Sequence, residues 1–264
     1  LESAAITVLA FNPTPQQRAE ALFLRSLAQF YFLDLYGQVP YRPVDEYNSI
    51  GPAPVMQPQE AIDTLVNTLT SIIPELPVSN IPYRASPDAA RFLLMKVLLN
   101  KGAFLNRQNP TFADEDMQQV IALGNTIISS GRYGLTENYF DNFGVDNATR
   151  SRERILAWPN SGAAQTNGIN NGGINARWMM TLHYNSWNQQ NTFGSAGWNG
   201  FTTVADFYNM FDANDERLGG QPYPGVTDQS GLLPGLVIGQ QFNQDGDSIY
   251  DRQGNPLAFT PEVN

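Results

Sequence analysis

Residues 19–41, AEALFLRSLAQFYFLDLYGQVPY, constrain the fold of this chain more than any other stretch. Apolar side chains lie on nearly every side of the helix that this stretch predicts, so neighbouring elements must cover most of its faces. Gly37 and Pro40 end the helix, because glycine adopts the left-handed capping conformation and proline cannot continue a helix. The apolar residues are Leu22, Phe23, Leu24, Leu27, Ala28, Phe30, Tyr31, Phe32, Leu33 and Leu35.

Four helices are predicted within residues 14–131. Thr14 is expected to cap the first of them, with Gln17 completing a capping box. The other three are expected at residues 58–73, from Ser86 onward, and at residues 114–131. Long, broadly apolar helices thus alternate twice with amphipathic ones. The sequence therefore predicts a mainly α fold in which helical hairpins stack as in tetratricopeptide arrays.

Helical periodicity mostly disappears in residues 132–264, where Gly, Asn, Trp, Thr and Gln dominate. A short helix is predicted at residues 203–211, and short strands are predicted at residues 155–158, 236–242 and 256–259. We expect a single domain over residues 1–264, in which a helical scaffold at 14–131 carries a loop-rich, ligand-facing region. Loops on a rigid frame are where binding residues concentrate.

Charge and composition exclude several classes of function. The formal net charge is −10, and Lys96 and Lys101 are the only lysines. A nucleic-acid partner requires a basic face on the protein, and an anionic membrane surface also attracts basic residues. The sequence shows no basic face, so both kinds of partner are disfavoured. The chain has no cysteine, so it has neither disulfides nor thiolate metal ligands. No apolar run approaches the roughly 20 residues of a membrane span, and a start at Leu1 without a leader fits a mature or trimmed chain.

All four tryptophans fall within residues 158–198, among many asparagines. A flat indole or phenol ring stacks on the apolar face of a pyranose, and neutral amides bond to its hydroxyl groups. This pattern predicts a site for a neutral sugar, although tryptophans also fill cores and Asn-Gly stretches also form turns. Trp158, in the strand-like ILAW run, is expected in the core. The candidate binding residues are Trp178, Tyr184, Trp187, Trp198, Asn185 and Asn188.

Several of these segments resemble the SusD/RagB family. Within residues 19–40, the resemblance rests on the Ala-Glu-Ala opening, Phe-Leu-Arg and Leu-Tyr-Gly-Gln-Val-Pro. Further along the chain, it rests on RASPDAARFLLMKVLLNKGAF and on WNGF followed by DFYNMFDANDERL. The resemblance implies a lipid-anchored protein on the outer face of the outer membrane, on a tetratricopeptide-like scaffold. It also implies capture of an oligosaccharide, or sometimes a peptide, for a TonB-dependent SusC-like transporter. Against the family pattern, this chain is expected to be an internal fragment without the anchor cysteine.

Catalytic and metal sites have weaker support. His183 is the only histidine, and a lone histidine among Asn, Tyr and Trp is more often a hydrogen-bonding loop residue than a catalyst. Residues 243–254 alternate oxygen ligands as a calcium loop does, but Ser248 and Gly254 replace the required Gly and Glu. We predict no cofactor. No carboxylate pair suggests a glycosidase; the candidates are Glu153, Asp206, Asp212, Asp215 and Glu216.

Three hypotheses follow from the sequence. The first is non-catalytic glycan binding at the cell surface, by stacking and amide hydrogen bonds. The second is a tetratricopeptide-like scaffold that binds a peptide or protein, and the third is a glycoside hydrolase. Because no catalytic signature is present, we expect a binding protein and not an enzyme.

Overall fold

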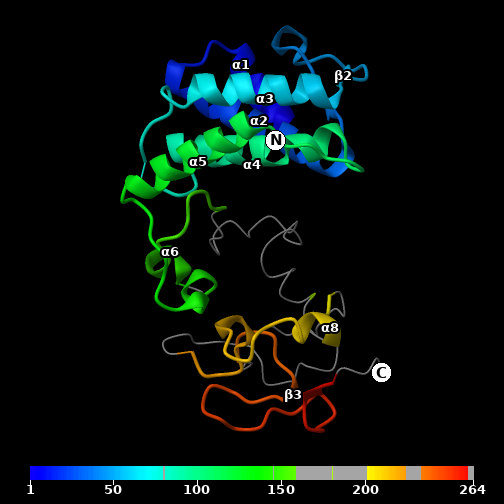
Figure 1. Cartoon of the computed structure of the whole chain (residues 1–264), viewed down its shortest axis with the longest axis vertical. Coiled ribbons are helices and arrows are strands. Elements are labelled where there is room, and N and C mark those ends of the chain that lie inside the picture. Colours follow the sequence, from blue (N-terminus) through cyan, green and yellow to red (C-terminus); the bar gives the residue numbers. More distant parts are fainter. Residues whose placement is uncertain (80, 145, 159–179, 181–200, 224–232, 261–264) are drawn as a thin grey trace. The chain divides into compact units, whose positions relative to one another are not determined.

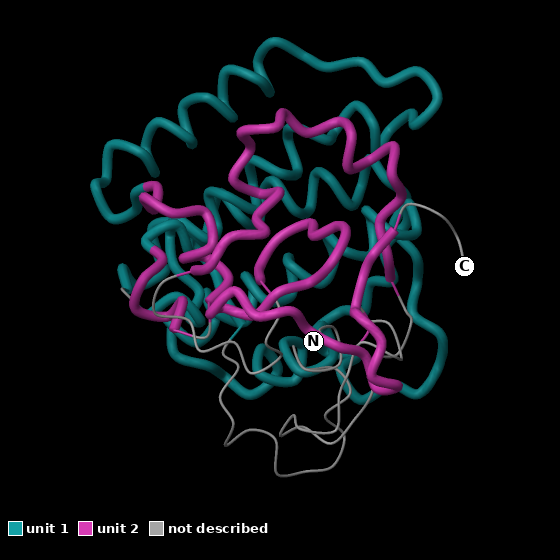
Figure 2. Tube along the Cα trace, turned by 90° about the horizontal axis from the view of Figure 1, so that it is seen from below, with its two compact units in different colours: residues 1–134, 152–158 teal, residues 135–151, 159–264 magenta. Residues whose placement is uncertain are grey.

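The computed structural model describes residues 1–79, 81–144, 146–158, 180, 201–223 and 233–260 (Figure 1). The chain divides into two compact units (Figure 2). Unit 1 comprises residues 1–134 and 152–158, and unit 2 comprises residues 135–151 and 159–264. Our prediction of one domain with a helical part and a loop-rich part stays a prediction, and each unit is described by itself below.

Unit 1 is helical, as the sequence predicts. The Thr14 side chain accepts a hydrogen bond from the Gln17 backbone N–H, and the Gln17 side-chain oxygen accepts one from the Thr14 backbone N–H, which confirms the capping box. Ser86 caps the helix that follows it by accepting the backbone N–H of Ala89. Gly37, in the left-handed conformation, ends the helix that Thr14 begins. The helices are α1 (Glu2–Ala10), α2 (Pro15–Tyr36), α3 (Pro58–Ile72), α4 (Pro87–Leu105) and α5 (Asp114–Ser129).

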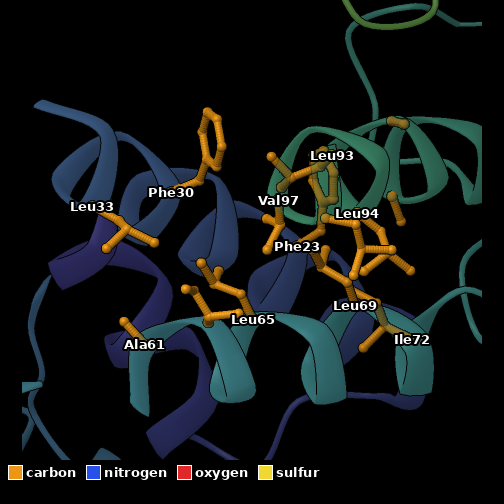
Figure 3. Close-up of a cluster of buried hydrophobic side chains, with 14 of the residues drawn as sticks. Phe23, Phe30, Leu33, Ala61, Leu65, Leu69, Ile72, Leu93, Leu94 and Val97 are labelled. Atoms are coloured by element: carbon orange, nitrogen blue, oxygen red, sulfur yellow. The ribbon is translucent and has the colours of Figure 1, made fainter. Parts of the chain in front are cut away.

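Each helix of unit 1 packs mainly on its neighbours in sequence, α1 on α2, α2 on α3, α3 on α4 and α4 on α5. The core lies where α3 faces α2 and α4. In Figure 3, Leu65, Leu69 and Ile72 point from α3 toward the side chains of the other two helices. The two short strands β1 (Val39–Pro40) and β2 (Val55–Met56) pair antiparallel and close the loop between α2 and α3. The predicted stacking of helical hairpins is confirmed.

Two features of unit 1 differ from the prediction. The sequence pattern suggests that α2 is covered on most faces, but Tyr31 is half exposed and Leu35 is more exposed still. Conversely, Arg25 and Gln29 of α2 are buried, because both contact the carboxylate of Glu2 in α1. The face of α2 that packs on α1 thus carries polar side chains, and one apolar edge of α2 remains exposed to solvent.

The described residues of unit 2 form only short elements. The predicted helix at 203–211 is shorter than expected, and the predicted strands near 240 and 258 form one antiparallel pair of two residues each. Single-residue bridges from Phe242 to Ser248 and from Tyr250 to Pro256 continue this ribbon. The elements are η2 (Tyr139–Asn142), α6 (Asn147–Arg150), α8 (Ala205–Tyr208), η6 (Glu216–Leu218), β3 (Gly239–Gln240) and β4 (Ala258–Phe259).

Candidate functional site

The six predicted ligand residues lie outside the described residues: Trp178, Tyr184, Trp187, Trp198, Asn185 and Asn188. His183 lies outside them as well. The prediction of an aromatic and amide-rich sugar site therefore stays a prediction.

Trp158 immediately precedes the segment, and our prediction that it lies in the core is wrong. Residues 155–158 form no strand: the chain bends at Ile155 and Leu156, and the backbone N–H of Ala157 donates to the carbonyl of Pro82. Ile155 packs partly against the core, whereas Trp158, beyond the bend, is 80% exposed. A large indole is thus available to solvent at the end of unit 1.

Tyr139 and Phe143 are exposed aromatic residues of unit 2 that we did not single out from the sequence. Their ring centres are 5.0 Å apart, and Phe143 is 63% exposed. Tyr139 donates its backbone N–H to the carboxylate of Glu216, which ties η2 to η6. The signal was present as three aromatic residues within YFDNF, next to amide and acid groups. An aromatic face beside polar groups is the chemistry that a sugar ring requires.

A polar cluster behind these rings holds η2 and α6 in place. The Arg150 guanidinium donates to Asp146 at 2.6 Å and to Asp141 at 3.4 Å. The Tyr223 hydroxyl donates to Asp141, and the guanidinium lies 5.6 Å from the Tyr223 ring centre. The hydrogen bond to Asp146 raises the pKa of Arg150 despite the opposing effect of desolvation. The cluster is internally paired, so its role is to position the loop.

Three of the carboxylates considered for glycosidase chemistry, Asp212, Asp215 and Glu216, make hydrogen bonds within the fold. Asp215 receives two hydrogen bonds from the Arg217 side chain and one from its backbone, which lower the Asp215 pKa to about 2. A general acid must hold a proton near neutral pH, and Asp215 cannot. Asp212 accepts the backbone N–H of Asn214. Both residues lie in the turn region between α8 and η6.

Residues 243–254 form two hairpin loops of the same design. The side-chain oxygen of Asn243 accepts the backbone N–H groups of Asp245 and Asp247, each at 2.9 Å. Eight residues later, Asp251 binds the N–H groups of Gln253 and Asn255 at 2.8 Å. These N–H groups hold the pKa of Asp251 below its ordinary value, although desolvation acts in the opposite direction. Oxygens that the calcium-loop alternative would use as ligands thus serve as turn acceptors.

Comparisons with known proteins show what the chain is similar to. It is 31% identical over 137 residues to the starch-binding protein SusD of Bacteroides thetaiotaomicron, an alignment that covers 51% of this chain and 23% of SusD. A protein solved with a xylogluco-oligosaccharide superposes with a TM-score of 0.62 at 19% identity, covering 80% of this chain and 42% of that one. The surface glycan-binding protein A of Bacteroides uniformis gives 0.61 at 13% identity, covering 94% and 52%. No family model matches.

The fold is therefore that of helical-scaffold proteins whose known examples include a surface glycan-binding protein. Within that class, the chain is similar in sequence to SusD over about half of its own length. It spans about a quarter of the length of SusD and about half the length of the two similar structures. Across the parts that the structure describes, no helix is both long enough and apolar enough to cross a membrane.

Proposed function

We propose that this protein binds an oligosaccharide without catalysis, on the outer face of the outer membrane, and delivers it to a TonB-dependent SusC-like transporter. The similarity to the starch-binding protein SusD, at 31% identity over half of the chain, carries the proposal. The exposed aromatic residues Trp158, Tyr139 and Phe143 support it, because such rings are costly to leave in water without a ligand or partner. In this proposal the site itself is formed by Trp178, Tyr184, Trp187, Trp198, Asn185 and Asn188.

Isothermal titration calorimetry with malto-oligosaccharides and xyloglucan oligosaccharides tests the proposal. We expect dissociation constants between about 1 µM and about 1 mM for at least one of them. Trp178→Ala or Trp187→Ala should weaken binding at least tenfold, since each removes a stacking surface, with an unchanged circular dichroism spectrum. Tyr36→Ala is the matched control, because Tyr36 is an exposed ring on α2. Unchanged affinity in both tryptophan variants would remove these residues from the site.

Delivery requires a second measurement. Affinity purification of the tagged protein from outer membranes should recover a TonB-dependent transporter in stoichiometric amount. Release of shortened sugars from a polysaccharide by the purified protein would instead favour the hydrolase hypothesis. Recovery of glycan binding without a transporter would leave surface capture standing and reject delivery.

A further inference from the structure

A pocket of about 340 Å³ lies on unit 1 where α2 and α4 meet residues 153–156. That volume is at the lower end of the range for ligand sites. Its lining is mainly apolar and includes the half-exposed rings of Tyr31 and Phe92, and residues 153–156, shortly before Trp158, complete it. The lining residues are Phe23, Leu27, Phe30, Tyr31, Ala89, Phe92, Leu93, Lys96 and residues 153–156.

Lys96 brings a positive charge to this apolar surface. Its ammonium lies 5.3 Å from the centre of the Phe30 ring. Within the part of the chain that the structure describes, none of the ion pairs includes Lys96, whereas Lys101, the other lysine, is bound to Asp116 at 3.0 Å. A cation on an aromatic ring at a solvent-open pocket is placed to receive an anionic group.

The apolar surface continues beyond the pocket along both helices. Leu35 follows Tyr31 by one helical turn on α2, and Leu99 follows Phe92 by two turns on α4, so each lies on the pocket face. Both leucines are at least half exposed. A strip of this shape suits an elongated ligand better than a compact one. A peptide segment meets that need, with one side chain anchored in the pocket and its neighbours along the strip.

We propose that this pocket docks a segment of a partner protein in which a large apolar side chain stands next to a single carboxylate. The apolar side chain fills the pocket, and the carboxylate pairs with Lys96. Glu153 and Arg154 also line the pocket, and because their charges are opposite, Lys96 gives the lining its net positive charge. The net charge of −10 disfavours further acids in the segment. This site goes beyond the sugar site, and neither depends on the other.

Fluorescence anisotropy of a labelled peptide tests the docking site on the full chain. The probe is Gly-Ser-Phe-Leu-Glu-Ser-Gly with an amidated C-terminus, and its matched control replaces Glu with Gln. We expect the Glu peptide to bind at least fivefold more tightly, with an advantage that shrinks as salt is raised. A third peptide, Gly-Ser-Phe-Leu with a free C-terminus, distinguishes a terminal carboxylate from a side-chain carboxylate as the source of the charge.

Two pairs of variants locate the binding. Lys96→Met should abolish the preference for Glu over Gln, whereas Lys101→Met should retain it. Phe92→Ala should weaken both peptides at least fivefold, whereas Ile121→Ala, at an exposed apolar position on α5, should leave them unchanged. Circular dichroism checks that each variant folds. Absence of binding by all three peptides, equal affinity for the Glu and Gln peptides, or equal effects of the two lysine variants would overturn the proposal.

Discussion

Unit 1 buries a continuous set of apolar side chains from α2, α3 and α4, whereas the described residues of unit 2 bury only two apolar side chains, Tyr223 and Leu257. In the described part of unit 2, polar contacts hold the backbone in place. Asn243 and Asp251 hold their hairpin loops through backbone N–H groups, and Arg150 joins η2 to α6. Unit 1 is held by apolar area removed from water, and the described part of unit 2 is held mainly by local hydrogen bonds.

This difference matters for function because apolar burial and binding compete for the same side chains. In unit 1 most large apolar residues are used to hold the helices together. In unit 2 aromatic side chains such as Phe143 and Phe207 remain exposed while polar contacts keep the backbone in place. A surface that keeps its aromatic rings in water is suited to stack on a sugar.

The strongest test of the contrast is a cavity in unit 1. Phe23 has no exposed surface, so Phe23→Ala should lower the free energy of unfolding by about 3–5 kcal/mol. Urea denaturation followed by circular dichroism measures this change. Leu35→Ala, on the open edge of α2, is the control and should stay within about 0.5 kcal/mol.

Leu257→Ala is the corresponding cavity in unit 2. We expect less than about 2 kcal/mol, because Leu257 does not belong to the large cluster of buried apolar side chains among the described residues. A loss in Leu257→Ala as large as that in Phe23→Ala would mean that apolar burial holds both units equally, and the contrast would fail.

The part of the fold that the sequence predicts well is the part with local signals. Thr14 and Gln17, Ser86 and Gly37 mark helix ends because their partners lie within four residues. The buried stripe of α3 is visible because one side of that helix faces the core along its whole length. The α1 helix was missed because it buries only Ala5 and Ile6, too few residues to show a period.

What the sequence does not reveal depends on distant partners. Arg25 appears to be a surface residue by type, and only the fold brings Glu2 to it. Trp158 belongs to an apolar run that is typical of a core strand, but the chain bends at Ile155 and Leu156 and leaves Trp158 exposed. The candidate sugar residues rest on composition and family resemblance, neither of which fixes the direction of a side chain.

Asp88 tests whether a polar contact can matter as much in unit 1 as in unit 2. This buried carboxylate, 2% exposed, accepts hydrogen bonds from Arg91, Arg132 and Tyr133, and so ties the start of α4 to the segment after α5. Asp88→Asn should lower the free energy of unfolding by about 2–3 kcal/mol in urea denaturation, since the arginines lose a charged acceptor at a buried position.

The same variant has a second readout that a merely loosened core would not give. Burial is the largest cause of the raised pKa of the Tyr133 hydroxyl, and the charge of Asp88 raises this pKa further. Asp88→Asn should therefore lower the pKa of Tyr133 but leave it above its ordinary value, as measured by NMR of isotope-labelled tyrosine. A Tyr133 pKa that does not move would contradict the described contact.

The smallest expected effect concerns the exposed Asp215–Arg217 pair of unit 2. The Arg217 side chain, followed by its backbone N–H, lowers the pKa of Asp215 to about 2. A carboxyl whose pKa is lowered on folding stabilises the native state above its unfolded pKa of about 3.9. That contribution disappears as the pH falls through about 2.

Arg217→Gln should raise the Asp215 pKa in an NMR titration, but not to its unfolded value, because the backbone N–H at position 217 still donates. Asp251 provides the internal control, since its pKa is lowered by backbone N–H groups and side-chain contacts of residues 253–255 and not by Arg217. An Asp251 shift equal to that of Asp215 would show that the substitution loosened unit 2 as a whole. Unit 2 would then depend on its exposed ion pairs far more than local turn contacts predict, and the contrast with unit 1 would be sharper.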